Sequence, residues 1–182
     1  MEGESDLIIR PATQQDVPSI NAILTYYILN TVMTFVTVGQ PDSVLSAKLH
    51  NITLENRLPF FVATKRPLPS KTTSRDNMSD FSDEVIGICY VSPYNPQRMA
   101  YCHTGELSLF IHHSHQGQGI GSALLRTVLT AIRGTRIREL LSVMAVDEKG
   151  KGNGLALRDY YKRWGFREVG TLEKVGFKFD RW

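Results

Sequence analysis

Residues 110–125 read FIHHSHQGQGIGSALL, and this stretch decides how the rest of the chain is interpreted. Before its glycines lies an alternating run, ELSLFIH, and an apolar helical pattern begins near Ile120. Glycines let the backbone turn tightly and approach a ligand closely, and the amide groups and dipole of a helix N-terminus favour an anion. A diphosphate is the natural ligand of such a loop, and a tight strand-to-helix turn without a ligand is the alternative.

Two common nucleotide-binding motifs fit this loop poorly. A dinucleotide fold places GxGxxG early in a parallel unit, whereas the loop here reads GxGxG. The P-loop of nucleotide triphosphatases requires GxxxxGK followed by Ser or Thr, and this loop contains no lysine. Both motifs are therefore disfavoured.

The flanking sequence predicts a mixed α/β fold, with strands and helices in the same domain. Apolar and alternating runs predict strands over residues 7–10, 60–64, 85–91, 106–112 and 140–146, with a last strand or hairpin arm over 171–179. Helical spacing predicts helices over 16–28, 43–56, from about 120 onward, and over 157–164. Because a hairpin is included, a mixed sheet is favoured over a strict βαβ array.

Local signals refine the first two predicted helices and one loop. Asp16 and Ser43 are the expected N-caps. The apolar stripe expected on the second helix consists of Val44, Leu45, Leu49 and Ile52. Residues 67–84 are rich in Ser, Asp and Pro and poor in aliphatic side chains, so we expect a flexible insertion between two strands.

The length and composition indicate a single domain over residues 1–182. The chain has 182 residues, 42% of them hydrophobic, enough for one sizeable core. Its net charge of +3 comes from 21 basic and 18 acidic residues without long basic blocks, so no nucleic-acid partner is indicated. With no apolar run of membrane-spanning length and no leader pattern, we expect a cytoplasmic protein that does not bind membranes.

The residues that most often bind metals give no metal-site pattern. Cys89 and Cys102 are not spaced as a CxxC pair, so reduced core thiols are expected. His112, His113 and His115 cluster before the glycine loop, but a strand end and a turn do not create a metal site, and solvent-facing histidines are expected.

Six blocks in the same order resemble one family of enzymes. They read IRPATQQDVPSINAI, YYILNTVMTF, YCHTGELSLFI, HQGQGIGSALL, YYKRWGF and VGFKFDRW. The Gln-x-x-Gly-x-Gly signature resembles the pyrophosphate loop of GNAT acetyltransferases, and the whole set resembles their phosphinothricin and methionine sulfoximine/sulfone N-acetyltransferase branch. The resemblance implies the GNAT fold, acetyl-CoA as cosubstrate without a metal, and transfer of acetyl to the primary amine of a small amino-acid-like substrate.

The resemblance also implies how acetyl-CoA is held. The strand backbone would pair with the pantetheine arm, the glycine loop would hold the diphosphate, and Asn153 would contact coenzyme A from a loop that is expanded here. These cofactor-binding residues are Leu109, Phe110, Ile111, Gln116, Gly117, Gln118, Gly119, Ile120, Gly121, Ser122 and Asn153.

Glu106 matches the family's general base. Only a neutral amine attacks a thioester, and deprotonating an α-amino group at pH 7 costs about 1.4 kcal/mol, against roughly 4.6 kcal/mol for lysine. A glutamate near pKa 4.3 needs a raised pKa or a relay water to act as a base. A surface carboxylate on an edge strand is the alternative for Glu106.

Tyr161 falls where GNAT enzymes commonly place the acid that protonates the departing thiolate. Tyr160 lies beside it, and a core aromatic is the alternative. The resemblance further implies that Phe35, Arg98, Tyr101 and His103 contact the acceptor. The related enzymes carry Lys-Ala-Arg where this chain has Asn-Pro-Gln-Arg, and the missing lysine argues against phosphinothricin as the preferred acceptor.

The end of the sequence bears on partners. In the family a further strand follows the segment that ends here at Trp182, so we expect a homodimer partner or another segment to cover a sheet edge. Two other functions remain open: a protein N-terminal or lysine acetyltransferase, and a non-catalytic acyl-CoA-binding module that keeps the glycine loop without needing Glu106.

Overall fold

The computed structural model describes residues 7–65, 83–150 and 152–182, which form two compact units. Unit 1 comprises Met1–Ile23 and Pro41–Ser142, and unit 2 comprises Leu24–Gln40 and Val143–Trp182. Each unit is described by itself. Most of the expected insertion, residues 67–82, lies outside the described residues.

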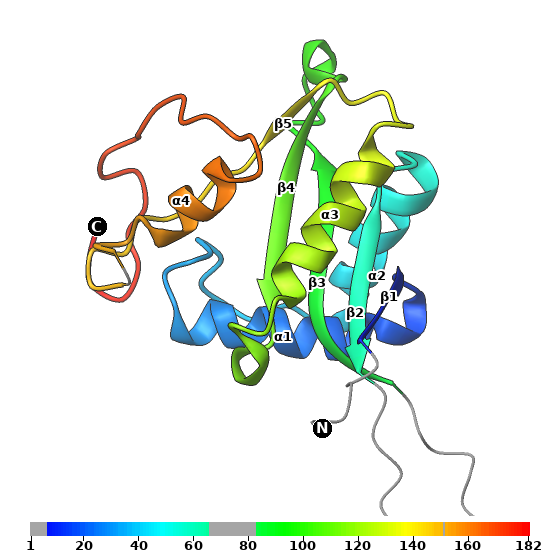
Figure 1. Ribbon diagram of the computed structural model, residues 1–182, viewed down its shortest axis with the longest axis horizontal. Coiled ribbons are helices and arrows are strands. Elements are labelled where there is room, and N and C mark those ends of the chain that lie inside the picture. Colours follow the sequence, from blue (N-terminus) through cyan, green and yellow to red (C-terminus); the bar gives the residue numbers. More distant parts are fainter. Residues whose placement is uncertain (1–6, 66–82, 151) are drawn as a thin grey trace, which may run out of the picture. The chain divides into compact units, whose positions relative to one another are not determined.

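Unit 1 contains a five-stranded sheet whose strands follow the order of the chain (Figure 1). Strands β1 to β4 pair antiparallel, and β5 pairs parallel to β4. The strands are β1 (Leu7–Pro11), β2 (Phe60–Lys65), β3 (Glu84–Pro93), β4 (Thr104–Ile111) and β5 (Glu139–Leu141). The predicted mixed sheet is confirmed.

Helix α3 (Ile120–Ile132) packs across one face of the sheet, in front of β2 and β3 in Figure 1. Small residues allow this close packing. A Cβ placed on Gly87 would lie 2.9 Å from Ile111 Cδ1 and 3.1 Å from Leu124 Cδ1, so any larger side chain would push the helix or strand away. Ile120, Leu124, Leu125 and Val128 of α3 are all buried.

The opposite face of β3 is covered by a helical segment over residues 42–55. Tyr90 alternates with Cys89 along β3, stacks on Phe60 at a centroid distance of 4.5 Å, and accepts a hydrogen bond of 2.8 Å from Lys48 Nζ. Lys48 belongs to α2 (Asp42–His50), which continues into a π-helical turn at Asn51–Glu55. The middle of β3 is therefore buried on both of its faces.

Two predicted N-caps are wrong. A 3₁₀ turn at Gln14–Asp16 precedes α1 (Val17–Asn30), and its N-cap is Thr13, not Asp16. Asp16 instead accepts hydrogen bonds from Thr13 and a pair at 2.7 and 2.8 Å from Arg10, because β1 brings the guanidinium to it. Ser43 lies inside α2, whose N-cap is Pro41.

The apolar stripe predicted for the second helix is right at three of four positions. Leu45, Leu49 and Ile52 are buried, but Val44 is 45% exposed. An isolated apolar side chain on a helix surface is common because buried area elsewhere is sufficient. The remaining short helical turns of unit 1 are 3₁₀ turns at Met99–Tyr101 and His113–His115.

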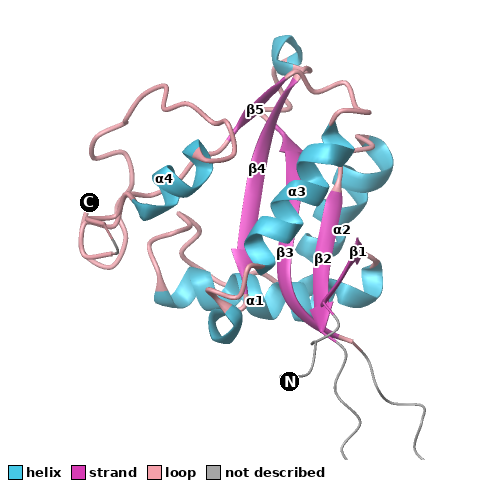
Figure 2. Cartoon of the chain, in the orientation of Figure 1, coloured by secondary structure: helices cyan, strands magenta, loops and turns pink. Residues whose placement is uncertain are grey.

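Unit 2 is built mainly from loops (Figure 2). It contains the end of α1 and the helix α4 (Ala156–Lys162), which confirms the predicted helix there. The strand predicted at 140–146 ends with β5 at Leu141, since Val143 and Val146 are exposed. The last predicted strand is also wrong: over 171–179 only an isolated bridge from Lys178 to Arg181 forms.

Candidate active site

The glycine loop of unit 1 has the backbone geometry that its sequence predicted. Gly117 and Gly119 have φ angles of 76° and 79°, values that favour glycine over residues with side chains. Gly119 is the N-cap of α3, and its carbonyl accepts hydrogen bonds from the amides of Ser122 and Ala123. The loop therefore ends directly at a helix N-terminus.

The space beside this loop is open. Apart from the adjoining residues, a Cβ placed on Gly117 or Gly119 would meet no atom of the described residues within 4 Å, so packing there does not require either glycine. The first turn of α3 contains no acidic residue that would repel negative charge. The loop thus suits the diphosphate of coenzyme A, whose two phosphates need close backbone approach.

Strand β4 carries the predicted base on the face opposite to α3. Glu106 pairs with Ser92 of β3 and with Leu141 of β5, and alternation places it on the same face as Ser108 and Phe110, as predicted. Its side chain is partly exposed. Within the described part of the chain no hydrogen bond or ion pair holds its carboxylate, which leaves it available to a substrate amine or a water.

The two parallel strands β4 and β5 run together over three residues. Their pairing begins at Thr104 with Glu139 and ends at Glu106 with Leu141, while β4 continues to Ile111 (Figure 1). Leu109, Phe110 and Ile111 therefore lie beyond the last β5 partner and lead toward the glycine loop. An extended thioester arm can pair with strand backbone in this way.

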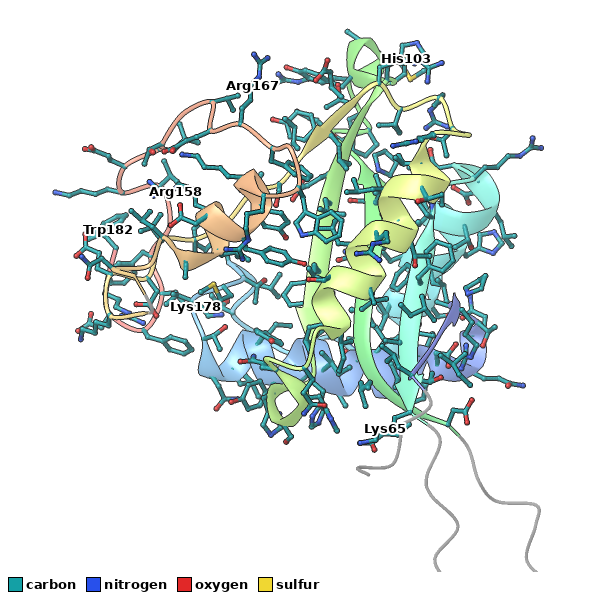
Figure 3. The ribbon with its side chains drawn as sticks, viewed as in Figure 1. Lys65, His103, Arg158, Arg167, Lys178 and Trp182 are labelled. Atoms are coloured by element: carbon teal, nitrogen blue, oxygen red, sulfur yellow. The ribbon has the colours of Figure 1, made fainter. Side chains whose placement is uncertain are left out.

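His103 is part of a structural link at the start of β4. Its Nδ1 lies 2.8 Å from the Arg136 carbonyl, and because a carbonyl only accepts, Nδ1 carries the proton. Its own carbonyl accepts from the amides of Arg138 and Glu139. Figure 3 labels His103 at this end of the sheet. Any acceptor contact from His103 would use the remaining ring nitrogen, Nε2.

Sequence reasoning missed Arg136, which fixes the same region. Its guanidinium donates to the Cys102 carbonyl at 3.0 Å and to both the carbonyl and the side-chain oxygen of Asn56 at 3.1 and 2.6 Å. Nothing in the sequence pattern joins Arg136 to a residue 80 positions away, so this contact had no local signal.

The other predicted acceptor contacts of unit 1 lie on the loop before β4. Arg98 is exposed, and its guanidinium has no partner among the described residues. Tyr101 packs edge-on against Tyr94, with ring centroids 5.2 Å apart. Arg98 begins the 3₁₀ turn that contains Tyr101, so the two side chains share one short segment.

The histidine cluster lies just before the glycine loop. The ring centroid of His112 lies 4.4 Å from that of His113 and 5.5 Å from that of His115. Burial, and then electrostatic interaction with His113 and His115, lower the pKa of His112 below its usual value. Across residues 7–65, 83–150 and 152–182 no group of three or more His, Cys, Asp or Glu side chains is arranged to hold a metal ion.

Unit 2 carries three predicted site residues. Tyr161 is buried in α4 and packs against Phe166 and Tyr160, with centroid distances of 5.3 and 5.5 Å. Asn153 has a φ of 52° between two glycines of the loop before α4. Phe35 is 56% exposed. Sequence reasoning missed Lys178, which is 6% exposed and was used only as part of a family block.

Comparison with known proteins agrees with this geometry. Residues 60–168 match the family model described as "Acetyltransferase (GNAT) domain". The phosphinothricin N-acetyltransferase of Alcaligenes faecalis is 30% identical, over 96% of this chain and 77% of that protein. The L-methionine sulfoximine/L-methionine sulfone acetyltransferase of Pseudomonas paraeruginosa is 29% identical, over 96% of this chain and 88% of that protein.

Solved structures give the same fold. A phosphinothricin acetyltransferase from Sinorhizobium meliloti in complex with acetyl-CoA has a TM-score of 0.78 and 25% identity, over 97% of this chain and 83% of that one. A ribosomal-protein-alanine N-acetyltransferase from Brucella melitensis has a TM-score of 0.76 and 27% identity, over 97% and 94% of the two chains.

A mixed sheet with a glycine turn at a helix N-terminus, taken together with these matches, indicates an acyl-CoA-dependent transferase. The chain belongs to the GNAT acetyltransferase family, and it is an acetyl-CoA-dependent enzyme. Among the described residues no helix is both long and apolar enough to cross a bilayer.

Proposed function

We propose that this enzyme transfers the acetyl group of acetyl-CoA to the α-amino group of a small amino-acid-like acceptor. The observation that best supports this proposal is that β4 combines two features. It carries the partly exposed carboxylate of Glu106, and its backbone continues past the last β5 partner toward the glycine loop. Relatives named for phosphinothricin and for methionine sulfoximine and sulfone support the acceptor class.

In this proposal the cofactor is held by the residues that the family resemblance indicates. Glycine-loop residues Gln116–Ser122 hold the diphosphate, the backbone of Leu109–Ile111 pairs with the pantetheine arm, and Asn153 contributes a further contact. A backbone amide of β4 polarises the thioester carbonyl, an interaction that is generally worth a few kcal/mol in acyl transfer.

Glu106 acts as the base, directly or through a water. The neutral amine attacks the thioester carbon, a C–N bond forms, the C–S bond breaks, and the amine proton passes to Glu106. Because an α-amino group is already partly neutral near pH 7, its deprotonation costs less free energy than that of a lysine acceptor. Tyr161 supplies the proton that the leaving thiolate takes up.

Acceptor recognition is assigned to four side chains. Arg98 binds the acceptor carboxylate, for which an unpaired guanidinium with a planar fork is suited. Tyr101, His103 and Phe35 are each assigned a contact with the acceptor's side chain. The absence of the lysine that related enzymes carry before this arginine leads us to expect methionine sulfone or sulfoximine to be preferred over phosphinothricin.

One other acceptor class has a specific observation in its favour. The similarity to a ribosomal-protein-alanine N-acetyltransferase points to acetylation of a protein N-terminus, which is also an α-amine. A peptide with N-terminal alanine and a free amino acid therefore need to be compared directly.

The test is acetyl-CoA-dependent release of free thiol with a panel of methionine sulfone, methionine sulfoximine, phosphinothricin and an alanine-initiated peptide. Turnover with the amino acids and none with the peptide is the expected result. The reverse pattern would replace the proposal with protein acetylation, and silence across the panel would reject both.

Glu106→Gln tests the base on the same assay. Because the amide cannot accept the amine proton, kcat is expected to fall about 100- to 1,000-fold near pH 7. Glu139→Gln, an exposed carboxylate on β5, is the matched control and should keep wild-type turnover. Unchanged kcat in Glu106→Gln would remove the base from the mechanism, and a binding-only module would show no turnover in any variant.

A further inference from the structure

Lys178 of unit 2 is a buried cation in a segment that is otherwise exposed. Its side chain is 6% exposed, whereas its neighbours Phe177 and Phe179 are more than half exposed. The chain turns tightly around it: Phe179 and Asp180 have φ angles of 51° and 58°, and Lys178 exchanges backbone hydrogen bonds with Arg181. This turn keeps the ammonium on the inner side.

The ammonium of Lys178 is held by main-chain carbonyls. Its Nζ donates to the carbonyl of Thr34 at 2.8 Å and to that of Val36 at 3.0 Å, the two carbonyls that flank Phe35 (Figure 3 labels Lys178). Among the described residues no carboxylate forms an ion pair with it. Burial lowers its pKa, which means that desolvation of the charge is not fully offset.

Burying an ammonium group without a carboxylate partner costs free energy. A lysine this buried would normally be replaced by an apolar residue or paired with an acid. Here both charge-assisted hydrogen bonds go to the three-residue stretch 34–36, which lies at least 142 positions before Lys178 in the sequence. They fix the backbone on both sides of Phe35.

Gly176 supports the ring of the same phenylalanine. A Cβ placed on Gly176 would overlap Cζ of Phe35 and lie 2.6 and 2.7 Å from its Cε atoms, so the ring rests on bare backbone. Phe35 as a whole is still 56% exposed. Lys178 therefore sets the position of the backbone, and Gly176 sets the position of the side chain.

We infer that Lys178 and Gly176 are positioning residues that hold Phe35 in place for acceptor binding and so set the enzyme's selectivity among amino-acid side chains. The inference rests on the proposed function, which places Phe35 at the acceptor slot. A ring fixed in advance costs less conformational entropy on binding and discriminates better between acceptors of different width.

Lys178→Met tests the role of the two hydrogen bonds. Methionine is similar in length but donates none, so the KM for methionine sulfone should rise about tenfold, while the KM for acetyl-CoA and kcat change less than about twofold. Lys174→Met, an exposed lysine on the same segment, is the matched control and should leave all three constants unchanged. An equal rise in both KM values would overturn the inference.

A double-mutant cycle with Phe35→Ala separates positioning from general stability. If Lys178 acts through the ring, adding Lys178→Met to Phe35→Ala should leave the acceptor KM within about twofold of the single alanine variant. A full tenfold additional loss would contradict the inference. Should Lys178→Met not fold, Gly176→Ala provides the second route, because its methyl group displaces the ring and should raise the same KM.

Backbone hydrogen exchange over residues 33–37 separates this inference from the proposed function. Faster exchange there in Lys178→Met than in wild type is expected, whichever acceptor the enzyme uses, and unchanged exchange would overturn the positioning role. If the wild-type enzyme acetylates no amino acid, the proposed function fails, and the selectivity claim fails with it.

Discussion

Different interactions stabilise the interior of each of the two units. All of the largest fully buried side chains, among them Ile20, Ile88 and Leu125, belong to unit 1, where a sheet is covered on both faces. Unit 2 exposes Val169, Leu172 and Val175 by 61% or more. Unit 1 is therefore held by regular packing, whereas unit 2 combines a smaller set of buried side chains with a few long-range polar contacts.

The backbone shows the same contrast. Of the six described non-glycine residues with positive φ, four belong to unit 2: Asn153, Lys174, Phe179 and Asp180. Such conformations cost free energy and persist where the surrounding contacts impose them. The comparison teaches that the turn of the proposed diphosphate loop is set by its own glycines, while the segment around Phe35 is held by individual contacts that can be removed one at a time.

The largest expected effect concerns the glycine loop. Gly119→Val forces a branched side chain into a φ of 79° and into the space beside the loop, so acetyl-CoA affinity should fall at least about 100-fold by calorimetric titration. Gly134→Val, at an exposed glycine without positive φ, should bind acetyl-CoA as wild type does. Retained affinity in Gly119→Val would mean that the diphosphate binds elsewhere.

The second prediction concerns the ion pair of unit 1. Asp16 is 6% exposed and takes two hydrogen bonds from Arg10, so Asp16→Asn should lower the free energy of unfolding by about 2 kcal/mol at pH 7. Urea denaturation measures this. Asp42→Asn, an exposed acid in the first turn of α2, is the control, and its loss should stay below about 1 kcal/mol.

The pH dependence of this effect follows from the pKa of Asp16. Burial opposes ionisation, but the hydrogen bonds from Arg10 and Thr13 outweigh it and lower the pKa below its usual value. The contribution of Asp16 is thus present above a pKa near 3.9, the unfolded-state value, and is lost as pH falls through the lower folded-state value. Equal differences between wild type and Asp16→Asn at pH 7 and pH 2 would contradict this assignment.

The third prediction concerns the two adjacent tyrosines of unit 2. Tyr161→Phe removes the proposed proton donor to the thiolate and should lower kcat about tenfold or more, with acetyl-CoA affinity unchanged. Tyr160→Phe is the matched control and should retain kcat, since Tyr160 is less buried and lies near Arg163. If the two variants exchange these results, the acid is Tyr160.

The smallest expected effect tests the strained backbone of unit 2. Lys174 is exposed and has a φ of 54°, so Lys174→Gly should raise the free energy of unfolding by about 0.5 kcal/mol, because glycine adopts this conformation without strain. Val175→Gly next to it has no positive φ to relieve and should be neutral or destabilising. A loss of stability in Lys174→Gly would show that its backbone is not strained.

The sequence was most informative where a repeating pattern coincides with burial. The ends of strands β2, β3 and β4 and the start of helix α3 were predicted to within two residues, because alternation and helical spacing there report which face is buried. The glycine loop could also be predicted, because the positive φ angles of its own backbone require glycine at Gly117 and Gly119.

The errors arise where distant contacts override local pattern. Asp16 matched the pattern of a helix cap, but its carboxylate binds Arg10 of β1. The apolar run 140–146 leaves the sheet after Leu141, and Val143 is exposed. Lys178 is buried although lysine is among the residues most often exposed, because its partners are carbonyls far away in the sequence. Neither composition nor periodicity carries that information.

The most direct test of the central claim is backbone hydrogen exchange of the wild-type enzyme with and without saturating acetyl-CoA. The claim predicts slower exchange on binding over residues 109–122, at the end of β4 and in the glycine loop, with β1 and α2 unchanged. Acetyl-CoA binding that leaves 109–122 unprotected, or no binding at millimolar concentration, would contradict it.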